Sequence, residues 1–132
     1  MKKTNKGFSL VELIIVIAIM AILIGVLAPQ YIKYVEKSRI SSDQDCADSL
    51  KNAAMTATTD EEYIYSISDK STIKFSKSGV ACTDKGLQAA LNEYFAKWTE
   101  CKVKSKSYQG KTYTVTVSED TKTNALKVTA TW

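Results

Sequence analysis

The sequence contains no histidine, a single proline and only five glycines. Without an imidazole it lacks the side chain that most often acts as a general base or binds a metal near neutral pH. It also has no glycine-rich phosphate loop and no nucleophile with a recognisable base beside it. We therefore expect that the protein is not an enzyme and that it carries no cofactor.

The acidic residues do not form a convincing metal site. Asp43, Asp45 and Asp48 are closely spaced, but on a helix these three residues would not share one face. They also lack the glycine turn of known calcium loops. We therefore expect no metal ion.

A strong excess of one charge is also missing. The formal net charge is +4, but three of the 18 basic residues precede Gly7, so the rest of the chain carries 15 basic and 14 acidic side chains. This balance gives no strong nucleic-acid signal. A local basic cluster is interpreted as the lysine-protected edge of a strand: Lys102, Lys104, Lys106 and Lys111.

Cysteine is scarce and odd in number, with Cys46, Cys82 and Cys101 only. A helix predicted between Cys82 and Cys101 would extend about 22 Å, whereas a disulfide needs Cα atoms within roughly 7 Å. A disulfide of Cys46 with Cys82 or Cys101 is therefore preferred. Alternatively, all three cysteines are small buried side chains or free thiols.

One long apolar run stands near the N-terminus, from Phe8 to Ala28. Its 21 residues would form a helix of about 31 Å, enough to cross a hydrocarbon layer of roughly 30 Å once. Glu12 is the single charge inside this run, and a carboxylate in a spanning helix costs about 2.5–3.5 kcal/mol unless it is paired. Alternatively, Glu12 reaches the headgroups and is stabilised by the helix dipole.

Two simpler interpretations of the run are less satisfactory. A secretory signal peptide would end in small residues, but Pro29 follows Ala28 directly and the apolar run is long for such a peptide. A plain uncleaved anchor fits the length and the lysines before Gly7. It leaves Glu12 unexplained.

The N-terminus resembles that of type IV pilins and pseudopilins. The shared features are a short lysine-rich leader ending in Gly7, then Phe8, a hydroxyl residue, Glu12 and a long apolar helix. The resemblance implies that a prepilin peptidase cleaves after Gly7 and N-methylates Phe8. The new amine of one subunit would then pair with Glu12 of a neighbour and set the register of a helical filament. Pro29, where these families commonly carry a proline, and Gly25 would kink or loosen the helix.

The resemblance also implies a function and partners. The chain would be the structural subunit of a type IV pilus, held in the bacterial cytoplasmic membrane and then assembled into an extracellular surface filament. An assembly ATPase and a platform protein would drive this homopolymerisation, and the fimbriae would serve cell adhesion, twitching motility, biofilm formation or DNA uptake. The alternatives are a pseudopilin of a type II secretion or competence system, and a monomeric membrane-anchored binding domain.

The remaining pattern predicts an α+β fold in which one long N-terminal helix packs against a small antiparallel sheet with an additional helix. The expected regions are the leader 1–7, an apolar helix half 8–29, an amphipathic helix half 30–57 and a globular domain 58–132. Residues at spacings of three and four predict the buried face of the second half: Tyr31, Val35, Arg39, Ser42, Cys46, Leu50, Ala53, Ala54 and Ala57.

Within the globular domain, alternating and apolar residues predict four strands at 63–67, 73–75, 111–117 and 126–132. The first of these is alternatively one helical turn with a capping box of Thr59 and Glu62. A helix over 84–98 is predicted by apolar residues at helical spacing, with Thr83 as its N-cap.

Overall fold

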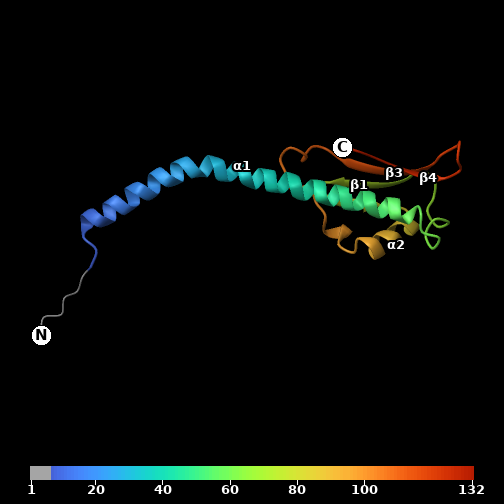
Figure 1. Cartoon of the computed structure of the whole chain (residues 1–132), viewed down its shortest axis with the longest axis horizontal. Helices are drawn as coiled ribbons and strands as arrows, with labels where there is room; N and C mark the ends of the chain where they lie inside the picture. Colours follow the sequence, from blue (N-terminus) through green and yellow to red (C-terminus); the bar gives the residue numbers. More distant parts are fainter. Residues whose placement is uncertain (1–6) are drawn as a thin grey trace, which may run out of the picture. The chain divides into compact units, whose positions relative to one another are not determined.

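The computed structural model describes residues 7–132 and shows an α+β protein, which confirms the predicted fold class (Figure 1). Residues 1–6 lie outside the described part, and with them most of the predicted leader. The elements follow in the order α1 (Leu10–Ala57), β1 (Ser71–Ser76), β2 (Gly79–Cys82), α2 (Lys85–Tyr94), the 3-10 turn η1 (Trp98–Glu100), β3 (Tyr113–Glu119) and β4 (Leu126–Thr131). The chain divides into two compact units, Met1–Val35 and Glu36–Trp132.

The first unit contains the apolar half of α1. The helix continues through Pro29, although this residue has no N–H to donate. The large apolar side chains are exposed all around this part of the helix: Leu13, Ile14, Ile15, Val16, Ile17, Ile19, Met20, Ile22, Leu23, Ile24, Val26 and Leu27. Nothing else in the described chain buries them.

The second unit contains a four-stranded antiparallel sheet with the order β2-β1-β3-β4. Side chains alternate between its two faces, as the pleat of a strand requires. Tyr113, Val115 and Val117 of β3 are buried, while the threonines between them are partly exposed. In β1, Ile73 and Phe75 point to the same interior.

The core of this unit lies where the second half of α1 meets the sheet and α2. In Figure 1 the strands run along one side of this half and α2 along the other. The helix contributes Leu50 together with alanines such as Ala53 and Ala54, whose small side chains allow close approach of the packed elements. α2 contributes Leu87 and Leu91, both fully buried.

The predicted buried face of α1 is correct only at its C-terminal end. Leu50, Ala53, Ala54 and Ala57 are buried as predicted, and Cys46 is half-buried. Tyr31 and Arg39 are exposed, while Asp43 and Ala47, which the pattern did not include, are buried. The contacts with the sheet, with α2 and with the rest of residues 58–132 decide which face of the helix is buried. The sequence spacing alone did not define this face.

Two local predictions are wrong, and one strand was not predicted. Residues 63–67 form turns instead of a strand, and the cap of the first turn is Asp60, whose carboxylate accepts from the Glu62 N–H at 2.9 Å. The helix predicted over 84–98 ends at Tyr94, because Phe95 leaves helical geometry with φ −145° and ψ 71°. The short strand β2 was not predicted.

Candidate functional site

The N-terminus of α1 is closed by a reciprocal pair of hydrogen bonds between Ser9 and Glu12. The Ser9 N–H donates to Glu12 Oε2 at 3.0 Å, and the Glu12 N–H donates to Ser9 Oγ at 3.2 Å. This is a capping box, which satisfies two backbone donors that the first helical turn would otherwise leave without partners. The carboxylate of Glu12 also lies where the positive end of the helix dipole favours a negative charge.

Gly7 and Phe8 lie immediately before this cap, outside the helix. The Phe8 side chain is 90% exposed. A peptide bond in such a segment is more accessible to a peptidase than one inside a helix, whose backbone is already hydrogen-bonded. The predicted cleavage bond and methylation site thus lie directly before the first turn of α1, which contains Glu12.

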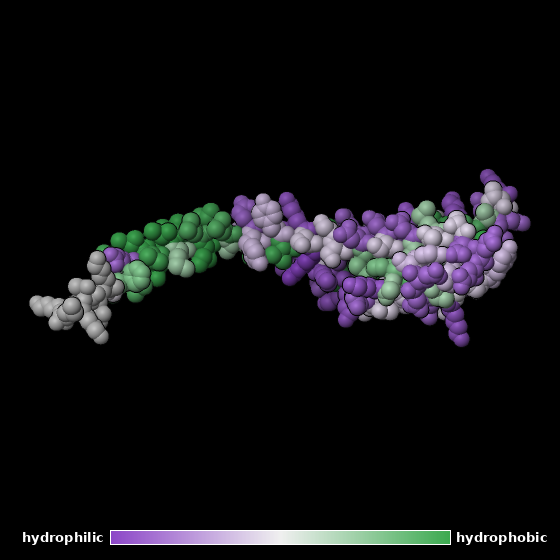
Figure 2. Space-filling view, turned by 60° about the horizontal axis from the view of Figure 1, so that its bottom comes forward, coloured by the Kyte–Doolittle hydropathy of each residue, from purple (hydrophilic) through white to green (hydrophobic). Residues whose placement is uncertain are grey.

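The apolar half of α1 is the largest exposed apolar surface of the described chain. Figure 2 shows hydrophobic side chains covering the visible face of this segment, while the second unit presents mainly hydrophilic residues. Its length and composition are sufficient for one membrane crossing. A contiguous apolar surface of this kind marks a membrane or protein contact. Gly25 lies within it with open space around its Cα, and Pro29 near its end.

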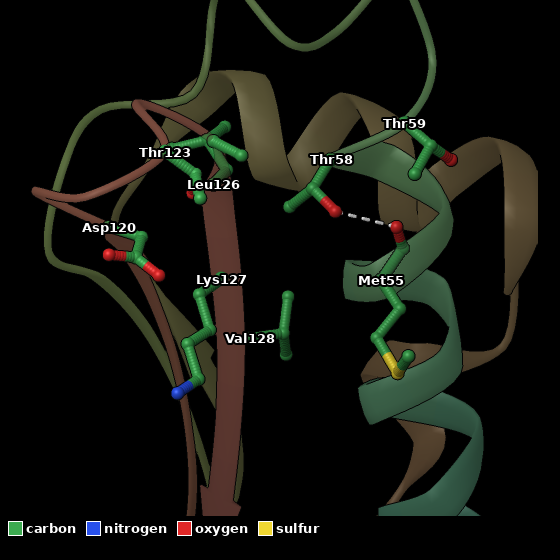
Figure 3. A pocket seen from close by; sticks show the side chains of 9 residues that line it. Met55, Thr58, Thr59, Asp120, Thr123, Leu126, Lys127 and Val128 are labelled. Atoms are coloured by element: carbon green, nitrogen blue, oxygen red, sulfur yellow. Dashed lines mark hydrogen bonds between the residues drawn. The ribbon is translucent and has the colours of Figure 1, made fainter.

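The second unit contains a groove of about 430 Å³ between the C-terminal end of α1 and the β4 side of the sheet (Figure 3). Met55, Thr58 and Thr59 line one wall, and Asp120, Lys127 and further residues line the other. The Thr58 hydroxyl is already used, since it donates to the Met55 carbonyl at 2.7 Å. The Thr59 hydroxyl likewise donates to the Thr56 carbonyl at 2.9 Å.

Among residues 7–132 no group of three or more potential metal ligands occurs. The three helix carboxylates considered for calcium are separated by the fold, because Asp43 is buried and Asp45 and Asp48 are exposed. Asp43 binds backbone instead: Oδ1 accepts from the Lys104 N–H and Oδ2 from the Ser105 N–H, both at 2.9 Å. About two turns earlier on α1, Glu36 Oε1 accepts from the backbone N–H groups of residues 106 and 107.

These contacts correct the interpretation of the basic cluster. Residues 101–104 form no strand, and the segment from 101 to 107 lies along α1 with its backbone held by Asp43 and Glu36. The lysines of this segment are exposed. The sequence analysis missed the role of Asp43. Its position one turn before Ala47 and two turns before Leu50 was the available signal.

Asp84, not Thr83, is the N-cap of α2. Its Oδ1 accepts from the Leu87 N–H at 2.8 Å, and its Oδ2 accepts from the Ser68 N–H and the Ser71 hydroxyl, each at 3.0 Å. Partial burial works to raise the pKa of Asp84, but the hydrogen bonds from these groups outweigh it and hold the pKa below its ordinary value. Asp84 therefore links β1 to α2 as a carboxylate.

The three cysteines are free thiols in two separate environments. Cys82 Sγ contacts the Asp84 carbonyl at 3.7 Å, and burial raises the pKa of its thiol. Cys101 is 4% exposed and lines the same small cavity as Cys46. Cys82 and Cys101 are not separated by a long helix, as the sequence predicted. α2 ends at Tyr94, and η1 returns to contact β2.

Comparison with known proteins places the N-terminal segment in a defined class. Residues 2–28 match the family model described as the prokaryotic N-terminal methylation motif. This match covers residues 2–7 of the predicted leader, the capping box and the whole apolar run.

The curated relatives are fimbrial proteins. The chain is 38% identical over 60 residues to the type IV major fimbrial protein FimA of Dichelobacter nodosus, which covers 46% of this chain and 38% of the relative. It is 38% identical over 64 residues to a fimbrial protein of Pseudomonas aeruginosa, covering 48% of this chain and 42% of the relative. These matches agree with the resemblance of the N-terminal segment to that of type IV fimbrial proteins.

The similarity has a limited extent. The matches span about two fifths of the length of these relatives. No solved structure matches the chain. What is said of residues 58–132 therefore rests on the contacts within this structure and not on a relative.

Proposed function

We propose that the chain is the structural subunit of a type IV pilus-like filament, made in the cytoplasmic membrane and assembled into a surface fibre. The observation that carries this proposal is the apolar half of α1, which lies within the segment that matches the methylation motif and has its large side chains exposed. Burying one such side chain is worth about 1.5–3 kcal/mol. A segment with a dozen of them requires lipid before assembly and other copies of the chain afterwards.

In this proposal, a prepilin peptidase removes residues 1–7 and the same enzyme methylates the new amine of Phe8. Cleavage creates a cation four residues before Glu12. In a filament, the ammonium of one subunit would lie against the Glu12 carboxylate of its neighbour. At 4 Å and an effective dielectric constant near 20, the attraction is about 4 kcal/mol, comparable with the cost of leaving the carboxylate unpaired.

The capping box adds a specific feature to this step. In the single chain the Glu12 carboxylate is not without partners, because it accepts from the Ser9 N–H. This contact holds the carboxylate at the start of the helix, within reach of an amine at Phe8 of another copy. Apolar packing, which surrounds the helix, supplies adhesion without a preferred stagger. The ion pair would select the stagger.

The same proposal assigns the chain a structural role rather than an enzymatic one. Its relatives are fimbrial proteins by name, and the sequence offers no nucleotide-binding loop to power extraction from the membrane. An assembly ATPase and a platform protein would supply this work.

The register role of Glu12 is tested by two variants with opposite effects on charge and capping. Glu12→Gln removes the charge but keeps a side chain that completes a capping box, whereas Ser9→Ala keeps the charge and removes the cap oxygen. Both variants are compared with wild type for membrane-inserted subunit and for subunit in sheared surface fibres. We expect Glu12→Gln to enter the membrane normally and to lose at least about tenfold in fibre yield, the equivalent of about 1.4 kcal/mol, and Ser9→Ala to assemble. Assembly of Glu12→Gln at the wild-type rate would contradict the register role.

A further inference from the structure

The segment from Cys101 to Tyr108 lies antiparallel to α1 in a fixed register. As the chain runs from 104 to 107, its backbone N–H groups bind first Asp43 and then Glu36, further toward the N-terminus of the helix. At the end of the segment, the Tyr108 hydroxyl accepts from Gln44 Nε2 at 3.1 Å. On its other side, the Val103 N–H donates to the Ser76 carbonyl at 3.2 Å, which attaches the segment to β1.

This register brings two cysteines to the same stretch of the contact between α1 and the segment 101–108. Cys46 lies three residues after Asp43 on α1, and Cys101 lies three residues before Lys104, whose N–H binds Asp43. Both residues line one small cavity of about 240 Å³. Cys82 does not line this cavity, and its sulfur contacts the Asp84 carbonyl instead.

We propose that Cys46 and Cys101 form a disulfide that joins α1 to the segment 101–108, and that Cys82 remains a free thiol. Two carboxylate-to-backbone contacts within one to three helical turns hold the partners in register, so that the bond can form with little movement of the backbone. The bond would fasten the globular unit to the helix that enters the filament core. Shear on the exposed unit would then not peel it from the helix.

The exchange would begin at Cys46, because this sulfur is half-buried whereas Cys101 is 4% exposed. Burial, with the neighbouring Cys46 thiol adding to it, raises the pKa of Cys101 to about 12, so that Cys101 is a poor first nucleophile. The oxidant is a disulfide, either of an exported thiol–disulfide oxidoreductase or of glutathione.

The atoms balance in two steps. Cys46 gives up its proton to solvent and attacks the oxidant's disulfide, which forms a mixed disulfide and releases one thiol. Cys101 Sγ then attacks Cys46 Sγ, its proton passes to the departing thiolate, and the second thiol leaves. Two cysteine thiols are oxidised and one disulfide of the oxidant is reduced. The availability of the oxidant in the cell and the mechanical role of the bond rest on the proposed function, whereas the pairing itself does not.

The test uses the full-length chain in detergent micelles. The chain is reduced, exposed to oxidised glutathione, blocked with N-ethylmaleimide, digested without reductant and analysed by mass spectrometry. The expected result is a peptide that links Cys46 to Cys101, with N-ethylmaleimide on Cys82. A major linked peptide that contains Cys82, or N-ethylmaleimide on all three cysteines, would overturn the proposal.

Two variants serve as matched controls. Cys82→Ala should form the linked peptide in wild-type yield, and Cys101→Ala should form no intramolecular link. A Cys46-to-Cys82 link of comparable yield in Cys101→Ala would show that the register does not select the pair. The same digestion on cells blocked before lysis separates the two proposals, because a chain that pairs with glutathione but is reduced in cells contradicts export and not the pairing.

Discussion

We expect the substitution Asp43→Asn, which keeps the shape of the side chain, to weaken the second unit strongly. The Asp43 side chain is 1% exposed, and both carboxylate oxygens accept backbone N–H groups, from Lys104 and Ser105. Asp43→Asn keeps the size and shape of the side chain. It replaces one accepting oxygen by an NH₂ group that donates, so that one of the two buried N–H groups meets another donor.

The magnitude follows from these contacts. A hydrogen bond to a charged group contributes about 1.5–3 kcal/mol, and leaving a buried donor unsatisfied costs a similar amount. We therefore expect Asp43→Asn to lower the free energy of unfolding by about 2–3 kcal/mol. For a unit of this size, each kcal/mol corresponds to about 4–8 °C in Tm, so a fall of roughly 10 °C or more is expected.

The assay is thermal unfolding of the intact chain in detergent, followed by near-ultraviolet circular dichroism of the tryptophans. Trp132 is a suitable reporter, because it stacks on Tyr108 at 4.1 Å between ring centroids. Asp45→Asn is the matched control, since Asp45 is exposed on the same helix and such changes are usually worth less than about 0.5 kcal/mol. Equal Tm values for the two variants would refute the role assigned to Asp43.

Three further predictions concern other contacts of the globular unit. Reduction of the proposed Cys46–Cys101 disulfide, which closes a loop of about 56 residues, should lower the free energy of unfolding by about 4 kcal/mol; denaturant unfolding with and without reductant measures this, and an unchanged midpoint would contradict it. Hydrogen bonds lower the pKa of Asp84 in the folded state. The contribution of Asp84 to the free energy of unfolding is therefore present above the ordinary pKa of 3.8 and is lost as the pH falls below 3.8 and through the folded-state pKa. Wild type should lose more stability than Asp84→Asn over this pH range, and parallel acid unfolding curves of the two proteins would be inconsistent with this prediction. Gly86→Ala should fail to reach wild-type stability, because the added methyl group would collide with the backbone of Ser66; a wild-type Tm would show that α2 can shift.

Elements with a strong local pattern could be predicted from the sequence. The unbroken apolar run and the following amphipathic stretch predicted one helix to Ala57, where α1 ends. The alternation of Tyr113, Val115 and Val117 with threonines predicted β3. The N-terminal motif was recognisable because its residues act through their local order, which needs no tertiary contact.

Features decided by tertiary contacts were missed or misplaced. β2 has only four residues, and its pairing with β1 rather than its own pattern makes it a strand. The end of α2 depends on Phe95 and on a hydrogen bond from Trp98 Nε1 to Asn92, which turns the chain back. From the sequence alone, Asp43 is expected to be a solvent-exposed acid on a helix. In the structure it binds backbone N–H groups of a segment about 60 residues further along the chain.

The apolar half of α1 is exposed in the single chain. The central claim is that processing at Gly7 and Phe8 prepares this half for burial among other copies. Intact-mass analysis of the subunit from purified surface fibres tests this most directly. The account predicts a chain that begins at Phe8, lacks residues 1–7 and carries one added methyl group on its N-terminal amine. A chain that keeps residues 1–7, found only as a single copy in the membrane, would contradict it.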